Sequence, residues 1–354
     1  MRLQLLGIST VALIGSLTGF MAAPVHAATT CVFTTQGQRM TLRANCETDA
    51  SISIPDGFTL DGRGRRIVAV DPPDGHFLGA VVRNAGATAH VRNLVIEARA
   101  LASVCDPAGP PDLRLAGILL ENASGSVTGT RVLNINQGVS GCQEGAAIAV
   151  RAEQGGEGEP LSVSIVRNRV EGFQKTGILV NGNVEAVVDR NRVVGLGPVD
   201  FIGQNGIQLG FGATGSVTRN QVSQNLYTQL DAASGGILIW NAGTQVEVAR
   251  NRIDDCDVGI WLLSSSEAVV ENNWVSDTTY EGIVVDGREG ASEGSLIVGN
   301  LSVSNPIGIG LHGAGARFNT VEDNVILFSS EAAIFVDPLA TDNTVGDNLV
   351  PGGS

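Results

Sequence analysis

Aromatic side chains are scarce in this sequence. Phe, Tyr and Trp make up 4% of the 354 residues, although 43% of the residues are hydrophobic. A core with so few rings has to be filled by Val, Ile and Leu, which suits a narrow interior. The repeated part of the chain has no helix-length amphipathic stretch, and no apolar run of membrane length follows the first residues. We therefore expect a β protein with no membrane span beyond its N-terminus.

Positive charge is also in short supply. The chain has 22 Lys and Arg against 36 Asp and Glu, which gives a formal net charge of −14. This charge disfavours nucleic acid and anionic membranes, so we expect neither as a partner. It slightly disfavours a highly anionic polymer as a substrate, unless cations are concentrated locally. The two histidines near the N-terminal coil, His76 and His90, show no metal-ligand spacing, so we expect no metal site.

The first residues have the pattern of a secretory signal peptide. Arg2 is followed by an apolar stretch over residues 3–20, and Val25, His26 and Ala27 form a small-residue cleavage signal. We expect cleavage after Ala27 and a secreted, extracellular protein. A membrane anchor is the alternative, which the cleavable end disfavours.

The most informative feature that is present is a phrase repeated every 22 to 31 residues: hydrophobic, two variable residues, Asn, one variable residue, hydrophobic. Its copies are Ile165–Val170, Val188–Val193, Val217–Val222, Val248–Ile253, Val270–Val275, Val321–Ile326 and Val345–Val350. A second phrase, Gly-Ile-x-aliphatic, lies between the copies. It occurs at Gly177–Val180, Gly206–Leu209, Gly236–Ile239, Gly259–Leu262 and Gly282–Val285. A fixed period of this length indicates stacked repeats.

The repeat predicts an all-β, right-handed parallel β-helix, a solenoid of about ten coils with an N-terminal cap. Short Val- and Ile-rich runs alternate with polar residues at period two, which favours strands, and each is separated from its copy by one coil. We expect the cap and first turn over residues 28–60 and the β-helix over residues 61–354. The repeated Asn is expected to be structural: it lies where one strand bends into the next and tolerates the left-handed conformation that such a bend needs.

Five cysteines in an exported chain favour disulfide pairing. Cys31 and Cys46 bracket a short segment and are expected to fasten the cap over the first coil. Cys105 and Cys142 precede consecutive Gly-Ile-type strands, so they could meet. Cys256 is left over and is expected to be a small buried hydrophobe rather than a nucleophile.

The segment Leu60–Ile67, read with the repeated Asn-x-Val and Gly-Ile-x-Leu phrases, resembles the pectate-lyase-like superfamily of secreted right-handed β-helix proteins. The loop phrases around Glu144, Lys175 and Asn205 look like an uncharacterised actinobacterial subgroup. The resemblance implies the fold over residues 50 to 350, and a family that includes lyases, glycosidases, epimerases and members without known catalysis. Of the catalytic phrases of the polygalacturonases in this superfamily, only the paired Asp with Cys has a match, at Asp254–Cys256. A pectate-lyase-like calcium site has no clear counterpart, so we expect no cofactor, with calcium left open.

The period-two alternation predicts which side chains of the Gly-Ile strands point outward, in three rows. The entry row includes Lys175, Gln204 and Asp257, the middle row includes Gln208, Trp261 and Gly310, and the exit row includes Arg151, Trp240 and His312. The longest departures from the minimal coil, residues 98–116, 136–146, 195–205 and 223–235, all precede such strands and should rise on one side of one face, where function usually lies. The predicted catalytic residues are Glu144, Lys175, Asp200, Asp231 and Asp257. The predicted substrate-binding residues are Gln143, Arg151, Gln204, Asn205, Gln208, Tyr227, Trp240 and Trp261.

These residue types point to carbohydrate chemistry. A glycosidase needs two carboxylates across the scissile bond, and Asp200, Asp231 and Asp257 arise on successive coils. A lyase needs a base and a neutralising cation, for which Lys175 and Arg151 are the nearby pair. Trp240 and Trp261 are expected either to be exposed platforms for sugar rings or to be covered by a loop. A second cluster of Asp286, His312 and Asp337 is interpreted as a surface ladder.

The sequence therefore predicts a secreted enzyme that cleaves an extracellular polysaccharide, as a glycoside hydrolase or a polysaccharide lyase. The alternative is a non-catalytic cell-surface or carbohydrate-binding solenoid. We expect a monomer, or a weak end-to-end oligomer through the edge of the last coil.

Overall fold

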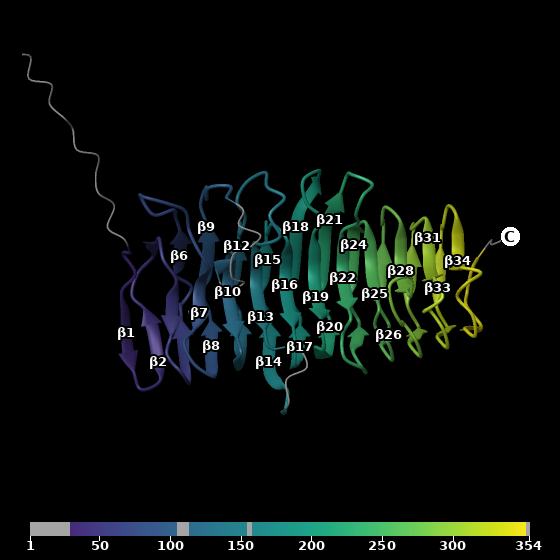
Figure 1. Cartoon of the computed structure of the whole chain (residues 1–354), viewed down its shortest axis with the longest axis horizontal. Coiled ribbons are helices and arrows are strands. Elements are labelled where there is room, and N and C mark those ends of the chain that lie inside the picture. Colours follow the sequence, from purple (N-terminus) through teal and green to yellow (C-terminus); the bar gives the residue numbers. More distant parts are fainter. Residues whose placement is uncertain (1–28, 105–112, 154–157, 352–354) are drawn as a thin grey trace, which may run out of the picture.

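Three long sheets, stacked coil by coil, make up the described part of the protein (Figure 1). The structure is a computed structural model, and it describes residues 29–104, 113–153 and 158–351. We call the three sheets I, II and III and list their strands below. Each coil contributes one strand to sheet III, then one to sheet I and one to sheet II. Every strand pairs in parallel with its copy in the next coil, apart from one antiparallel pair at the start. The predicted parallel β-helix is therefore confirmed. Nothing in the described residues forms a helix long and apolar enough to span a membrane.

Sheet I has 13 strands. They are β1 (Phe33–Gln36), β2 (Arg39–Leu42), β5 (Phe58–Asp61), β8 (Thr88–Arg92), β11 (Ser124–Thr128), β14 (Leu161–Val166), β17 (Val184–Asp189), β20 (Thr214–Thr218), β23 (Glu247–Ala249), β26 (Val269–Glu271), β29 (Leu296–Val298), β32 (Thr320–Glu322) and β35 (Thr344–Val345).

Sheet II has 11 strands, most of them three residues long. They are β3 (Cys46–Thr48), β6 (Arg66–Ala69), β9 (Val95–Ala98), β12 (Arg131–Leu133), β15 (Arg169–Glu171), β18 (Arg192–Val199), β21 (Gln221–Tyr227), β24 (Arg252–Cys256), β27 (Trp274–Ser276), β30 (Leu301–Val303) and β33 (Val325–Leu327).

Sheet III also has 11 strands and contains the Gly-Ile phrases. They are β4 (Ile52–Ile54), β7 (Ala80–Asn84), β10 (Ala116–Glu121), β13 (Ala146–Arg151), β16 (Thr176–Asn181), β19 (Asn205–Gly210), β22 (Gly235–Trp240), β25 (Val258–Leu263), β28 (Glu281–Asp286), β31 (Ile307–His312) and β34 (Ala332–Val336).

The interior is a continuous column of aliphatic side chains. In sheet III the inward positions form one register row, which includes Ile148, Ile178, Ile207 and Ile237, all with no exposed surface. Each coil adds only a few such residues, and every one packs on its copies above and below. This is why a chain so poor in aromatic residues still has a closed core.

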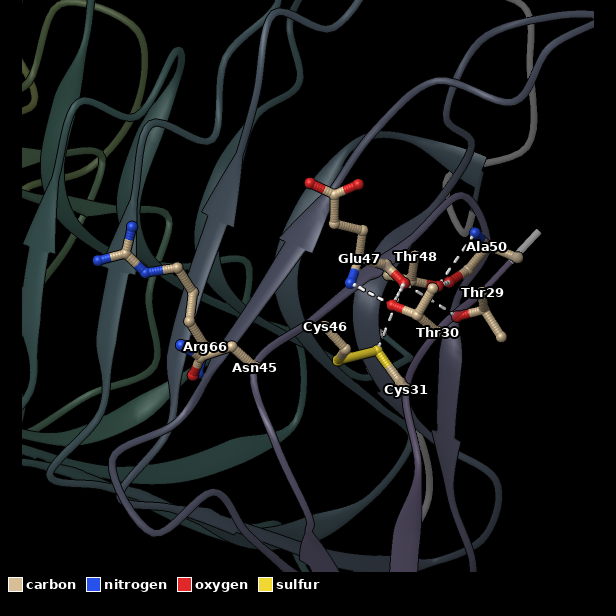
Figure 2. The surroundings of a disulfide bond; sticks show 9 residues. All are labelled: Thr29, Thr30, Cys31, Asn45, Cys46, Glu47, Thr48, Ala50 and Arg66. Atoms are coloured by element: carbon tan, nitrogen blue, oxygen red, sulfur yellow. Dashed lines mark hydrogen bonds between the residues drawn. A yellow bond between two sulfur atoms is a disulfide. The ribbon is translucent and has the colours of Figure 1, made fainter. Parts of the chain in front are cut away.

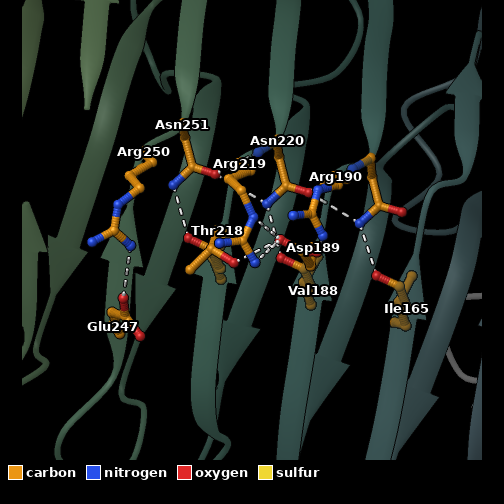
Figure 3. Close-up of polar contacts among 12 residues, drawn as sticks. Ile165, Val188, Asp189, Arg190, Thr218, Arg219, Asn220, Glu247, Arg250 and Asn251 are labelled. Atoms are coloured by element: carbon orange, nitrogen blue, oxygen red, sulfur yellow. Dashed lines mark hydrogen bonds and ion pairs between the residues drawn. The ribbon is translucent and has the colours of Figure 1, made fainter. Parts of the chain in front are cut away.

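The repeated Asn residues form a buried ladder at the corner between sheet I and sheet II (Figure 3). The Oδ1 atom of Asn220 accepts from the backbone N and the Nδ2 of Asn191, at 2.9 and 3.0 Å, and its Nδ2 donates to Val188 O and to Asn251 Oδ1. The pattern recurs along the ladder, which also contains Asn300. The structural role predicted for these Asn residues is thus present in the fold.

The predicted conformation of these Asn residues is wrong. The left-handed residue of each bend is the one before the Asn, as at Arg219 with φ 55° and Arg250 with φ 56°, and the ladder Asn residues have no positive φ. The Asn side chain has to point inward to reach its neighbours, so the turn of the chain falls on the residue before it.

The N-terminal end is closed by the antiparallel pair of β1 and β2 and by a disulfide between Cys31 and Cys46 (Figure 2). This disulfide confirms the predicted first pair. Cys142 is also disulfide-bonded, whereas its predicted partner Cys105 lies outside the described residues. Cys256 is free and has no exposed surface, as predicted. The predicted signal peptide, residues 1–27, lies outside the described residues as well.

Candidate functional site

The longest connections of the solenoid lie at the edge between sheet II and sheet III (Figure 1), although nine residues also separate Asp286 of sheet III from Leu296 of sheet I. In the first half of the chain the strands on either side of this edge end and begin far apart, for example at Leu133 and Ala146. Beyond residue 250 the connection shortens to one residue between Cys256 and Val258. The predicted placing of the insertions on one side is confirmed. Parts of two of them are strand, because β18 and β21 extend to Val199 and Tyr227.

Two carboxylates and a phenol meet on adjacent loops of this edge. Tyr227 ends β21 beside Val199, its register partner in β18, and Asp200 follows directly. Partial removal from water, a hydrogen bond to Asp231 and the charges of Asp231 and Asp200 raise the pKa of Tyr227. Tyr227 is therefore close enough to both carboxylates for their charges to act on it. Three of the residues predicted from the sequence are brought together here.

Lys175 lies beneath the loop that carries Asp200. Its Nζ donates to Gly203 O at 2.7 Å, and burial lowers the pKa of Lys175 to about 8. The amine is therefore partly neutral at mildly alkaline pH, which a general base requires.

The predicted pairing of Lys175 with Arg151 is wrong. Arg151 is the last residue of β13 and lies opposite Asn181 at the end of β16, whereas Lys175 precedes the start of β16. A strand of six residues places the Cα atoms of the two residues about 20 Å apart. A lyase mechanism that uses both groups on one sugar has no geometric basis.

Asp257 is buried, with 1% of its surface exposed, so its predicted outward orientation is wrong. Its Oδ2 accepts from the backbone N of Tyr227 and of Ser234, both at 2.8 Å, and its Oδ1 accepts from the hydroxyl of Thr279 at 2.9 Å. Asp257 thereby holds both ends of the loop that carries Asp231. It acts as a positioning group, because a carboxylate that satisfies buried N–H groups is more stable inward than in solvent.

Gln204 was placed on the outer face by the alternation, and this is wrong too, since it has no exposed surface. Its Oε1 accepts from Leu196 N and its Nε2 donates to Phe173 O and Gln174 O. The side chain turns inward because the connection before β19 leaves backbone groups that no strand satisfies.

Glu144 is likewise used locally, because its Oε2 accepts from Leu115 N at 2.6 Å. The neighbouring Gln143 is exposed, with its Nε2 3.4 Å from Gly141 O. Of the two, Gln143 presents its side chain to solvent.

Asn205 and Gln208 lie on the outer side of sheet III, but both are buried, with 6% and 5% of their surface exposed, and they contact each other. Asn205 Nδ2 donates to Gln208 Oε1 at 3.0 Å, and Gln208 Nε2 donates to Asn181 Oδ1 at 3.3 Å. Arg151 is the register neighbour of Asn181. These amides form a polar strip across the face, next to a small apolar cluster. That cluster is made by Ala80, Ala116, Leu119, Ala146 and Ala149, which are buried although they point outward.

Trp240 and Trp261 are only partly exposed. The Trp240 ring packs against Phe211, with 5.0 Å between centroids, and Trp261 Nε1 donates to Asp286 Oδ2 at 3.2 Å. Asp286 is itself held by Arg288, whose hydrogen bonds and charge lower the pKa of this carboxyl despite its burial, which acts in the opposite direction. The most exposed indole is Trp274, at 41%, which the sequence reasoning missed.

A histidine–carboxylate pair was also missed. His312 Nε2 lies 2.9 Å from Glu281 Oε2, and the imidazole stacks on Phe335 with 5.1 Å between centroids. The predicted neighbours of His312, Asp286 and Asp337, are engaged elsewhere, with Arg288 and with backbone N–H groups. The signal for the pair is Gly310 in the middle row, since any side chain there would collide with both groups.

Two hollows of the surface lie away from these residues. One of about 670 Å³ contains Ser53, Arg83 and Glu121, and one of about 720 Å³ contains Phe328 and Glu331 at the last coil. Among the described residues, no group of three or more His, Cys, Asp or Glu is placed to hold a metal ion. The candidate site is therefore an open surface along the loop edge, without a metal cluster in that part of the chain.

A protein-family model described as "Right handed beta helix region" matches residues 146–326. The sequence matches no curated protein. The fold is similar to the Dettilon tailspike protein, with 17% identity, a TM-score of 0.55, and coverage of 86% of this chain and 63% of the tailspike, so that the chain spans less than two thirds of that protein.

Two solved enzymes have similar folds. The DFA-IIIase from Arthrobacter chlorophenolicus A6 without its lid has 15% identity and a TM-score of 0.50, over 88% of this chain and 86% of the enzyme. A point mutant of the periplasmic alginate epimerase AlgG has 13% identity and a TM-score of 0.51, over 90% of this chain and 77% of the epimerase. At these identities the likeness shows the fold.

Proposed function

The chain belongs to the right-handed β-helix family, and we propose that it is a secreted enzyme that cleaves an extracellular polysaccharide at its loop edge. The observation that carries this proposal is the meeting of Asp200, Tyr227 and Asp231 on adjacent loops. Support also comes from the similar fold of an alginate epimerase and from the disulfide Cys31–Cys46, which suits an oxidising compartment.

The chemistry that fits is glycoside hydrolysis. Two carboxylates on opposite sides of a glycosidic bond serve as general acid and as nucleophile or base. In this proposal Tyr227, which lies close to Asp231, orients that carboxylate, while Asp257 anchors the loop from beneath. Gln143 supplies an exposed amide on the adjoining surface for a sugar hydroxyl, whereas Asn205 and Gln208 are buried and hold each other.

The test is turnover of a polysaccharide panel, followed by the release of reducing ends. Asp200→Asn and Asp231→Asn should each lower kcat/KM at least about 100-fold, because each removes an acid–base group. Tyr227→Phe should lower it about 10-fold, since the carboxylate stays but loses its orienting donor. Glu185→Gln, at an exposed carboxylate of β17, is the matched control and should keep the parent rate.

Parent rates in both Asp variants would refute the hydrolase. Products that absorb in the ultraviolet as unsaturated uronates would instead identify a lyase. In that case Lys175→Gln should abolish the reaction, since Lys175 is the base candidate whose pKa of about 8 suits proton abstraction.

A non-catalytic carbohydrate-binding solenoid is the second candidate. It is favoured by the local use of Glu144, Lys175 and Asp257, each of which hydrogen-bonds a backbone group. Retention on an immobilised polysaccharide without any product from the whole panel would select it.

A further inference from the structure

The corner between sheet I and sheet II contains a concentration of arginine. In four consecutive coils the buried ladder Asn has an exposed residue on each side of it. The three residues are Arg-Asn-Arg in three of these coils and Arg-Asn-Gln in the other. In each triplet, the residue before the Asn lies in the bend and the residue after it begins the strand of sheet II. We call the arginines of these triplets, together with Arg131 at the same strand position of the preceding coil, the arginine corner. Its members are Arg131, Arg167, Arg169, Arg190, Arg192, Arg219, Arg250 and Arg252. Figure 3 shows Arg190, Arg219 and Arg250 in file beside the Asn ladder.

The backbone of the bends does not require arginine, although Arg190 and Arg219 also pair with the buried carboxylate of Asp189. Each bend residue donates its backbone N–H to the next coil in the same way, and each has a φ between 50° and 64°. In the coils before and after the arginine corner this position is occupied by Asn93, Gly129, Asn272, Gly299 and Asp323. Gly, Asn and Asp tolerate the left-handed conformation, whereas in other residues Cβ comes too close to the following carbonyl oxygen. Four successive arginines at a costly position indicate a use for their side chains.

The charge of the corner is opposite to that of the protein. Five carboxylates pair with its arginines, namely Glu171, Asp189, Glu247, Asp254 and Glu271. Eight positive and five negative charges leave +3 at the corner, so the remainder of the −14 chain has −17. Among the described residues no carboxylate lies within 4.0 Å of Arg131 or Arg167. The guanidinium-bearing side chains of the corner's ion pairs are 42–56% exposed.

An exposed indole continues the same row. The register of sheet II runs from Arg131 through Arg169, Arg192, Gln221 and Arg252 to Trp274. The Arg252 guanidinium lies over the Trp274 ring, 4.2 Å from its centroid. A flat aromatic face in line with repeated cations binds a chain that has both anionic groups and apolar ring faces.

We propose that the arginine corner binds a linear anionic polysaccharide, carboxylated or sulfated, lengthwise along the solenoid. The arginines repeat at the strand spacing of about 4.8 Å, which suits an extended glycan with one charge on each sugar or on alternate sugars. Their guanidinium groups hold carboxylates or sulfates in two-point contacts, and Trp274 stacks on a sugar ring at the end of the row. The strongly negative remainder repels broad polyanions such as duplex DNA, so only a narrow chain confined to the corner is favoured.

This binding surface lies on a different corner from the loops with Asp200 and Asp231. The inference is therefore independent of the catalytic proposal, and the two fail separately. Asp231→Asn should leave binding at the arginine corner unchanged, whereas loss of the corner should leave cleavage of a short neutral oligosaccharide unchanged.

The test is binding of sodium polygalacturonate to the full chain, measured by calorimetry from 50 to 300 mM NaCl. The parent protein should bind, and log Kobs should fall linearly with log salt concentration because counterions are released. Arg192→Gln with Arg252→Gln should weaken binding at least tenfold and reduce the slope by about 1.4, or about 0.7 for each contact with a single-stranded polyanion. Trp274→Ala should weaken binding without changing the slope.

Arg317→Gln is the matched control. Arg317 is 45% exposed, pairs with Glu293 and lies 5.6 Å from the Phe318 ring, so it repeats the local chemistry outside the corner. Unchanged unfolding midpoints would show that the variants fold. The proposal is overturned if the double variant binds like Arg317→Gln, if neutral dextran binds as well as polygalacturonate, or if duplex DNA binds more tightly than either.

Discussion

Replacing Asn220 with alanine removes the centre of the buried ladder. Asn220 is 1% exposed, and its amide accepts from Asn191 N and donates to Val188 O. Alanine leaves these two buried backbone groups without that partner. Each such group costs about 1–3 kcal/mol, so the free energy of unfolding should fall by about 2–6 kcal/mol.

The matched control is Asn348→Ala at the last coil. Asn348 makes the same kinds of bond, to Asn324 and Val321, but it is half-buried and solvent can replace its amide. Its loss should cost less than about 1 kcal/mol. Equilibrium urea unfolding of both full-length variants, followed by circular dichroism, measures the difference. Equal costs at the two sites would show that burial of the ladder does not set its contribution, and would refute the reasoning.

Two further predictions concern buried titratable groups. Burial lowers the pKa of Lys175 from 10.5 to about 8, so between these pH values the unfolded chain binds more protons than the folded one. The free energy of unfolding should therefore rise with pH across that window, by an amount on the order of 3 kcal/mol. Lys175→Met should remove this rise, and an unchanged pH dependence of unfolding in the variant would contradict the prediction. Burial raises the pKa of Cys256 to about 12, so an aromatic disulfide reagent at pH 8 should modify this thiol only after denaturation. Cys256→Ala should abolish that late reaction, and modification of the native protein faster than it unfolds would count against the prediction.

The sequence predicted the fold because the fold repeats. The same pattern of Val, Ile and Asn recurs in each coil, so one local inference about period two was tested many times within one chain. Individual bends were less predictable. Asn is the residue most often associated with a left-handed turn, yet Arg219 and Arg250 take that conformation here, because the ladder requires the Asn side chain to point inward.

The candidate site was predictable only in part. Loop lengths placed Asp200, Tyr227 and Asp231 on one edge, and the structure brings these three together. Alternation failed for Asp257 and Gln204, since both lie just before a strand, where unsatisfied backbone N–H and C=O groups compete with solvent for the side chain. A period-two pattern has no information about that competition.

The two proposed surfaces follow from the same property of a solenoid. Its core constrains only the inward positions and the bends, so any coil can depart from the repeat without disturbing its neighbours. One departure is in length, and it gathers loops with Asp200 and Asp231 at the edge between sheets II and III. The other departure is in residue type. Arginine occupies bends at which Asn or Gly, as found at Asn93 and Gly299 in other coils, would cost less conformational energy. A departure that costs conformational energy is stronger reason to infer selection than one that costs nothing. On this ground the arginine corner is the more diagnostic of the two surfaces, although no insertion marks it.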